Sequence, residues 1–73
     1  MALVTSKEML LNAQKGHYAV GAFNVENMEM VMAVIAVAEE LNAPVMLQTT
    51  PSTVKYAGLS MYLANCKAAA EQA

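Results

Sequence analysis

Two short runs of strand-forming residues, joined by a stretch with helical periodicity, constrain the fold of this chain most strongly. The first run, "YAVGAFNV", covers residues 18–25, and the second, "VMLQT", covers residues 45–49. Val, Tyr and Phe favour strands. Between the runs, apolar residues recur from Val31 to Ala38 at spacings of three and four, which is typical of one helix face. This order predicts two parallel strands joined by a right-handed crossover.

The apolar content of these segments predicts extensive burial. The first run is almost entirely apolar, which is typical of a parallel strand that is covered on both faces. Gly21 inside it is expected to permit close packing. On the following helix, a second apolar stripe of Met30, Val34, Val37 and Leu41 overlaps the first. We therefore expect the buried face of this helix to be broad.

Capping signals place the ends of the first two helices. Thr5 and Glu8 form a T-x-x-E capping box, which predicts a leading helix over residues 6–15. Gly16 is expected to end that helix, because glycine is common just past a helix C-terminus. Asn27 is expected to cap the central helix.

The last third of the chain predicts a short helical turn and then a longer helix. The turn covers residues 51–56, Gly58 breaks it, and Ser60 is expected to cap a final Ala-rich helix. That helix reaches the last residue without a stop signal, so we interpret the sequence as truncated there. Because two strands cannot cover three helices, the pattern predicts an α/β piece of a larger barrel or open sheet.

Composition excludes several classes of protein. The chain has 73 residues, which leaves no room for a second domain, and 58% of them are hydrophobic. A net charge of -2 and the absence of arginine argue against nucleic-acid binding. The longest apolar run, residues 30–38, is far shorter than the ~20 residues that cross a bilayer, and no signal-peptide pattern is present. We expect a soluble, cytoplasmic protein with no membrane partner.

One cysteine and one histidine limit the metal and thiol chemistry of the chain. Cys66 has no partner for an internal disulfide, suits a reducing compartment and is expected to be an inert thiol within a helix. His17 precedes the first strand and is expected at the surface. A catalytic zinc needs three protein ligands, so these two side chains cannot hold one.

Polar side chains stand where both strands end. Asn24 closes the first run, and Gln48 and Thr50 follow the apolar part of the second. Side chains alternate along a strand, so Gln48 and Thr50 share one face if the second strand extends that far. Parallel α/β folds bind ligands at the carboxyl ends of their strands. We interpret the three residues as a candidate site; in the simpler interpretation, strand ends meet water and Thr50 caps the next turn.

The segment "YAVGAFNVENMEMVMAVIAVAEELNAPVMLQTTPSTVKYAG" resembles the N-terminal stretch of class II, zinc-dependent ketose-bisphosphate aldolases. This family includes the fructose- and tagatose-1,6-bisphosphate enzymes. The resemblance rests on G-x-F-N, then a helix rich in Glu and Ala, then A-P-V-x-x-Q-x-[ST]. The opening "LVTSKEMLLNAQKGHYAVGAFN" is similar to the family's leading helix and first strand, so the resemblance covers nearly the whole chain.

The resemblance implies the N-terminal portion of a TIM (β/α)8 barrel, typically about 250 residues long. Residues 1–73 would supply a leading helix and the first two βα units. It also implies that Thr50 contacts substrate near its aldehyde half, that Gln48 lines the site and that Asn24 braces it. No catalytic or metal-binding residue would lie within this chain, because the catalytic Asp and the zinc-binding His residues of the family would come after residue 73.

The activity implied for the intact enzyme is reversible cleavage of a ketose 1,6-bisphosphate to dihydroxyacetone phosphate and glyceraldehyde 3-phosphate. Zn²⁺ would act as a Lewis acid on the ketone, and an acid–base carboxylate would serve the aldehyde oxygen. The partner would be a phosphorylated sugar, the intact enzyme a homo-oligomer, and the 73-residue chain alone inactive. The alternative is a non-catalytic small α/β module that self-associates or binds a protein partner through exposed apolar faces. Another phosphate-binding barrel with a similar start is a third possibility.

Overall fold

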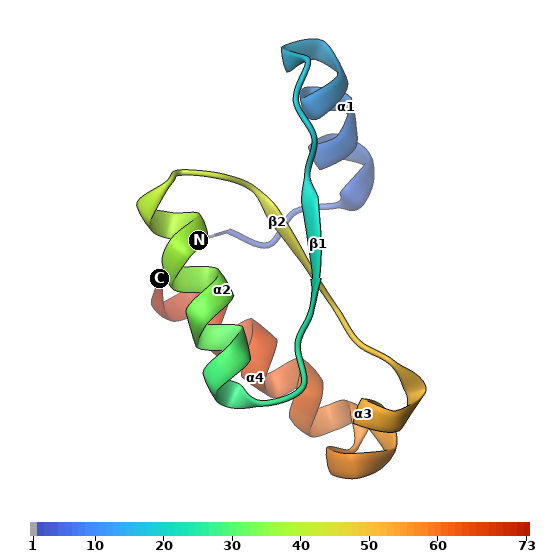
Figure 1. Cartoon of the computed structure of the whole chain (residues 1–73). Coiled ribbons are helices and arrows are strands. Elements are labelled where there is room, and N and C mark those ends of the chain that lie inside the picture. Colours follow the sequence, from blue (N-terminus) through green and yellow to red (C-terminus); the bar gives the residue numbers. More distant parts are fainter. Residues whose placement is uncertain (1) are drawn as a thin grey trace.

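Helices alternate with two short strands along the chain, as the pattern predicts (Figure 1). The computed structural model describes residues 2–73. Within this range the elements are α1 (Ser6–Gly16), β1 (Gly21–Asn24), α2 (Met28–Glu40), β2 (Val45–Gln48), α3 (Pro51–Ala57) and α4 (Leu59–Gln72). The strands form one parallel pair, which confirms the predicted α/β pairing.

The paired part of each strand is shorter than predicted. Gly21 pairs with Val45 and Asn24 with Gln48, so the ladder spans four residues of each strand. Tyr18 does not join it, because its N–H donates to the Ala13 carbonyl at 3.1 Å and completes the end of α1. The predicted strand over residues 18–25 therefore includes residues that belong to a helix terminus.

The leading helix begins as predicted and ends differently. The Thr5 hydroxyl accepts a hydrogen bond from the Glu8 N–H at 3.3 Å, as its capping-box position predicts. Gly16 is still helical, and His17 takes the left-handed conformation (φ 58°, ψ 45°) that glycine was expected to supply. Gly16 serves a different purpose, because a β-carbon there would lie 2.5 Å from the Tyr18 ring.

Helix α2 buries one of its two predicted apolar stripes. Its cap is the predicted one, since the Asn27 side chain accepts from the Met30 N–H at 2.8 Å. The residues of the first stripe, Val31, Ile35 and Ala38, are buried against the sheet and α4. Three residues of the second stripe, Met30, Val37 and Leu41, are exposed, and Leu41 retains 69% of its accessible surface. The fourth, Val34, is half-buried against the core. The expectation of a broad buried face is therefore wrong for the chain as it stands.

The connection between α3 and α4 also departs from the prediction. Helix α4 begins at Leu59, and its N-cap is Gly58 rather than Ser60. Gly58 has φ 88°, so the chain can reverse there, and its N–H donates to the Val54 carbonyl at 2.7 Å. Its own carbonyl accepts from the Tyr62 N–H at 3.2 Å, which starts α4 two residues before the position that Ser60 would have set.

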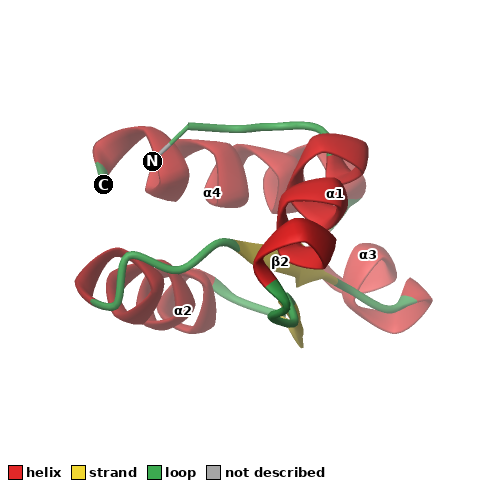
Figure 2. Cartoon of the chain, turned by 90° about the horizontal axis from the view of Figure 1, so that it is seen from above, coloured by secondary structure: helices red, strands yellow, loops and turns green. Residues whose placement is uncertain are grey.

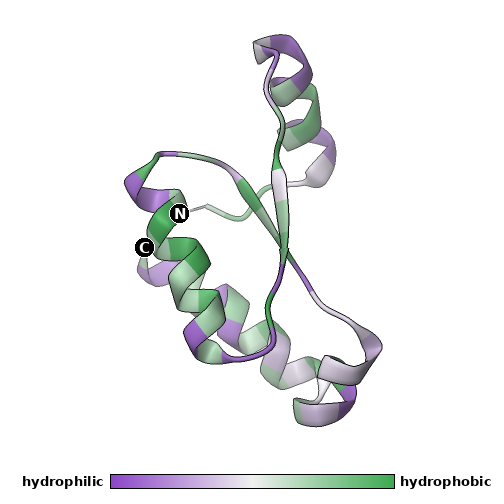
Figure 3. Cartoon of the chain, in the orientation of Figure 1, coloured by the Kyte–Doolittle hydropathy of each residue, from purple (hydrophilic) through white to green (hydrophobic). Residues whose placement is uncertain are grey.

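The hydrophobic core lies on one face of the sheet. Val25, Val31 and Ile35 form its centre, and Leu47, Tyr62 and Cys66 are among the partly buried residues that pack around them. Helix α2 contacts β2 and packs against α4, and the two helices lie side by side in Figures 1 and 2. Figure 3 shows that α2 is hydrophobic along much of its length. All four residues of β1 are exposed, so the expected burial of this strand on both faces is wrong within the described residues.

Candidate functional site

The carboxyl ends of β1 and β2 bring Asn24 and Gln48 together. The two residues are register partners in the parallel ladder, and the Gln48 amide nitrogen donates to Asn24 Oδ1 at 2.6 Å. Paired positions of a ladder point to the same side of the sheet. The prediction that these two amides meet at one end of the sheet is confirmed, whereas their role toward a substrate stays a prediction.

The amide pair faces away from the core and keeps unused hydrogen-bonding groups. Leu47 packs toward the core, so the preceding and following residues of β2, Met46 and Gln48, point to the opposite side. An amide carries two donor hydrogens and one acceptor oxygen. The single bond between the pair therefore leaves the Gln48 oxygen as an acceptor and the Asn24 nitrogen as a donor. Side by side, these groups can bind a hydroxyl that both donates and accepts.

Thr50 lies beyond the end of β2 and caps the next helix. Because the strand ends at Gln48, the alternation that would place Thr50 on the same face does not extend to it. Its hydroxyl oxygen accepts from the Thr53 N–H at 3.5 Å and contacts the hydroxyls of Ser52 at 3.0 Å and Thr53 at 3.3 Å. The capping role proposed as the simpler interpretation is thus confirmed, and a substrate role would have to act alongside it.

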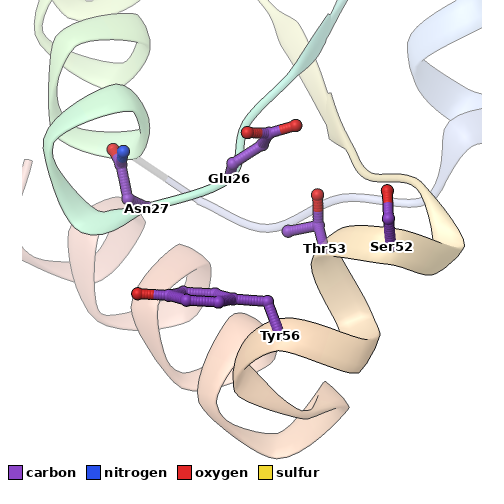
Figure 4. A pocket seen from close by; sticks show the side chains of 5 residues that line it. All are labelled: Glu26, Asn27, Ser52, Thr53 and Tyr56. Carbon is purple, nitrogen blue, oxygen red and sulfur yellow. The ribbon is translucent and has the colours of Figure 1, made fainter.

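A polar pocket of about 350 Å³ opens at the same end of the sheet (Figure 4). It lies between the β1–α2 connection and α3, and its lining residues are Glu26, Asn27, Ser52, Thr53 and Tyr56. Figure 4 shows the Glu26 carboxylate extending toward the hydroxyl groups on α3. Sequence reasoning did not select these residues. The available signal was their position, since they directly follow the two predicted strand ends.

The lining groups favour a hydroxyl-rich ligand over an anionic one. Glu26 provides a carboxylate, and the lining residues within the described range include no lysine. The hydroxyls of Thr50, Ser52 and Thr53 carry three protons, and their two mutual contacts use two, so one proton remains for a ligand. A ligand hydroxyl could donate to Glu26 and accept from α3, whereas a phosphate would be repelled by the carboxylate.

One hydroxyl beside the pair and pocket lacks a partner. Thr49 follows β2 directly, and its Oγ1 is buried without a hydrogen bond. An unpaired buried hydroxyl costs roughly 1–3 kcal/mol. The segment that carries Gln48 and Thr50 is therefore not optimised for the stability of this chain alone.

The described residues do not fit a catalytic zinc ion. Within residues 2–73, no three His, Cys, Asp or Glu side chains come close enough together to hold a metal. His17 stands at the end of α1, before β1, and Cys66 lies in α4. The polar carboxyl-end groups are amides, hydroxyls and one carboxylate, which is not the N/S-rich set that zinc prefers.

Tyr62 and Cys66 have the shifted pKa values that partial burial produces. Burial, followed by the neighbouring Cys66 group, raises the pKa of Tyr62 to about 12. Burial also raises the pKa of the Cys66 thiol, which lowers the fraction of reactive thiolate. The thiol is half-buried against the core, in agreement with the expected unreactive side chain.

The family model for class II fructose-bisphosphate aldolases matches residues 4–73. This match covers nearly the whole chain, and it includes both strands, the amide pair and the residues that line the polar pocket. The chain belongs to the class II fructose-bisphosphate aldolase family. Within the described residues, no helix is long and apolar enough to span a membrane.

Proposed function

We propose that residues 1–73 form the start of a (β/α)8-barrel aldolase that reversibly cleaves a ketose 1,6-bisphosphate. The products are dihydroxyacetone phosphate and glyceraldehyde 3-phosphate. The observation that carries this proposal is the Asn24–Gln48 hydrogen bond at the carboxyl end of a parallel pair, in a chain of the aldolase family. In parallel α/β enzymes this end carries the substrate site.

The three predicted site residues take different roles in this proposal. Thr50 gives one hydrogen bond to the triose part of the substrate while its oxygen continues to cap α3. Asn24 and Gln48 hold each other in position and present one donor and one acceptor toward the inside of the barrel. Each such bond contributes on the order of 1 kcal/mol.

The proposed reaction needs residues outside this chain. When bound, Zn²⁺ would supply Lewis-acid polarisation of the ketone, and its ligands and the catalytic Asp would come from beyond residue 73. Without them, the 73-residue chain is expected to show no zinc-dependent cleavage of fructose 1,6-bisphosphate. The proposed intact enzyme is a cytoplasmic homo-oligomer, and the reducing cytoplasm suits a chain with a single cysteine.

The test compares two capping threonines in an intact enzyme that carries this segment. Thr50 and Thr5 both cap a helix by accepting from the N–H three residues on, but Thr5 precedes α1 and β1 in the chain, whereas Thr50 follows the carboxyl end of β2. Thr50→Val should lower kcat/KM for fructose 1,6-bisphosphate by roughly tenfold, the effect of losing about 1.4 kcal/mol in the transition state. Thr5→Val loses a similar cap and should leave kcat/KM within about twofold.

Steady-state kinetics well below the unfolding temperature of each variant would separate catalysis from folding. Gln48→Leu removes the amide while keeping a side chain of similar size, and should lower kcat/KM by a similar factor. If Thr50→Val and Gln48→Leu showed the same kcat/KM as the control Thr5→Val, Thr50 and Gln48 would be removed from the proposed substrate site.

A further inference from the structure

Glu26 brings a carboxylate to the polar pocket from the connection between β1 and α2. The ladder bonding reaches one residue beyond β1, because the Val25 N–H donates to the Gln48 carbonyl at 2.9 Å, and the Val25 side chain is fully buried in the core. Side chains alternate along extended backbone, so Glu26 follows on the side opposite to Val25, which is the side of Asn24. Figure 4 shows the Glu26 carboxylate extending toward the hydroxyl groups on α3.

Both walls of the polar pocket lie at the carboxyl end of the sheet. One wall is the β1–α2 connection, and the other is α3, which follows β2. In a closed (β/α)8 barrel, the connections that follow the carboxyl ends of the strands form the active-site face. A barrel that continues from α4 would keep these two neighbouring connections on that face, so the place of Glu26 does not depend on a free strand edge.

The hydroxyl of Thr50 joins the pocket to the proposed triose site. Thr50 Oγ1 contacts the hydroxyl oxygens of Ser52 at 3.0 Å and of Thr53 at 3.3 Å. Ser52 and Thr53 both line the pocket together with Glu26. A ligand that takes a hydrogen bond from Thr50 can therefore extend past these hydroxyl groups to the Glu26 carboxylate.

The triose that leaves as an aldehyde carries one group that fits the carboxylate. Glyceraldehyde 3-phosphate has a carbonyl group, a hydroxyl on the neighbouring carbon and a phosphate. A carboxylate only accepts hydrogen bonds, and it repels a phosphate. The sugar hydroxyl can donate to Glu26 while its oxygen accepts the proton that the hydroxyls of Thr50, Ser52 and Thr53 leave unused.

We propose that Glu26 is a specificity-determining residue that accepts a hydrogen bond from the substrate hydroxyl next to the aldehyde carbon. This inference rests on the proposed aldolase function. The hydrogen bond is charge-assisted, which makes it roughly twice as strong as a neutral one. No proton is transferred, and the contact orients the aldehyde half with its phosphate away from the pocket. An aldehyde without this hydroxyl leaves the carboxylate without that donor and is therefore a poorer substrate.

The test measures the addition of dihydroxyacetone phosphate to two aldehydes by an intact enzyme that carries this segment. The aldehydes are glyceraldehyde 3-phosphate and 3-oxopropyl phosphate, which lacks only the hydroxyl. In the unaltered enzyme, kcat/KM should be at least roughly tenfold higher for glyceraldehyde 3-phosphate. Glu26→Leu removes the acceptor and should bring the two values of kcat/KM to within about twofold of each other. Glu29→Leu is the matched control, because Glu29 carries the same charge in the first turn of α2 and does not line the pocket. This control should keep the preference of the unaltered enzyme.

A second variant covers the case in which Glu26→Leu fails to fold. Glu26→Gln keeps the shape of the side chain and one acceptor oxygen, and should lower the preference by about threefold. An unchanged preference in Glu26→Gln or in folded Glu26→Leu would overturn this inference, as would an equal loss of preference in Glu29→Leu. The proposed function would survive either result if Thr50→Val still lowered kcat/KM. An intact enzyme without any aldol addition would overturn both.

Discussion

Two hollows lie on the same small scaffold and differ in the chemistry of their walls. One is the polar pocket at the carboxyl end of the sheet, and the other is an apolar groove of about 460 Å³ between β1 and α2, whose lining includes Gly21, Phe23, Val34, Val37 and Leu41. The pocket is lined by a carboxylate, an amide, two hydroxyls and a tyrosine, whereas the groove is lined by aliphatic and aromatic side chains and glycine. Both open to solvent, and both are bounded by β1 or the residues that follow it.

The difference shows how position along a strand separates two kinds of contact. Residues after the last ladder bond, in which the Val25 N–H donates to the Gln48 carbonyl at 2.9 Å, can be polar because their backbone is free to turn toward water. Residues within the strand alternate between two faces, and those toward α2 are apolar. A small polar ligand suits the first region, and another protein surface suits the second.

The largest expected effect is a loss of stability when a core residue of α2, rather than a groove residue of the same helix, is truncated. Val31 is 2% exposed and packs in the core, whereas Val37 is 53% exposed in the groove. Val31→Ala should lower the free energy of unfolding by about 2 kcal/mol, because it leaves a cavity. At low concentration, Val37→Ala should change it by less than about 0.5 kcal/mol. Urea unfolding followed by circular dichroism measures both, and equal losses would show that the groove is packed rather than open.

Beside the polar pocket, we expect a smaller change in the free energy of unfolding, and it is a gain rather than a loss. Thr49→Val replaces an unpartnered buried hydroxyl with a methyl group and should raise the free energy of unfolding by about 1 kcal/mol. Thr53→Val is the contrast, because Thr53 is 5% exposed and its hydroxyl contacts Thr50 at 3.3 Å. It should lower the free energy by a similar amount. Thermal unfolding of both variants would contradict this account if Thr49→Val proved the more destabilising.

The smallest expected effect at neutral pH is the change in the free energy of unfolding caused by Tyr62→Phe, and this change depends on pH in the alkaline range. The folded pKa of about 12 exceeds the ordinary value of 10.0, so the folded state favours the neutral phenol. This stabilisation is complete below pH 10 and is lost as the pH rises toward 12. Tyr62→Phe cannot ionise there and should lose less stability over that interval. The midpoints of urea unfolding at about pH 10 and about pH 12 test this expectation for both proteins. Equal losses of stability in the two proteins would contradict the raised pKa of Tyr62.

Local patterns predicted the elements and their order well. The caps at Thr5 and Asn27, the parallel pairing and the meeting of Asn24 with Gln48 all follow from short-range chemistry and strand alternation. These features depend on neighbours in sequence or on the two-residue period of a strand. The family resemblance, read from G-x-F-N and the segment after Pro44, is confirmed by the match over residues 4–73.

The errors fall where tertiary context decides. The extent of β1 could not be predicted, because Tyr18 joins the end of α1 and only a partner strand defines a ladder. Burial of the second stripe on α2 needs a neighbour that the pattern cannot supply. The polar pocket escaped prediction because it joins Glu26 to residues of α3 that are distant in sequence and carry ordinary capping chemistry.

A single residue, Gly58, joins α3 to α4 and has a positive φ. No atom lies within 4 Å of the place that a β-carbon would occupy there, and no side chain caps the start of α4. The angle between the two helices is therefore set by the 88° torsion of Gly58 together with the contacts that α3 and α4 make with each other. A rotation at this pivot would widen or narrow the space beside Glu26 while Val25, Val31 and Ile35 remained undisturbed.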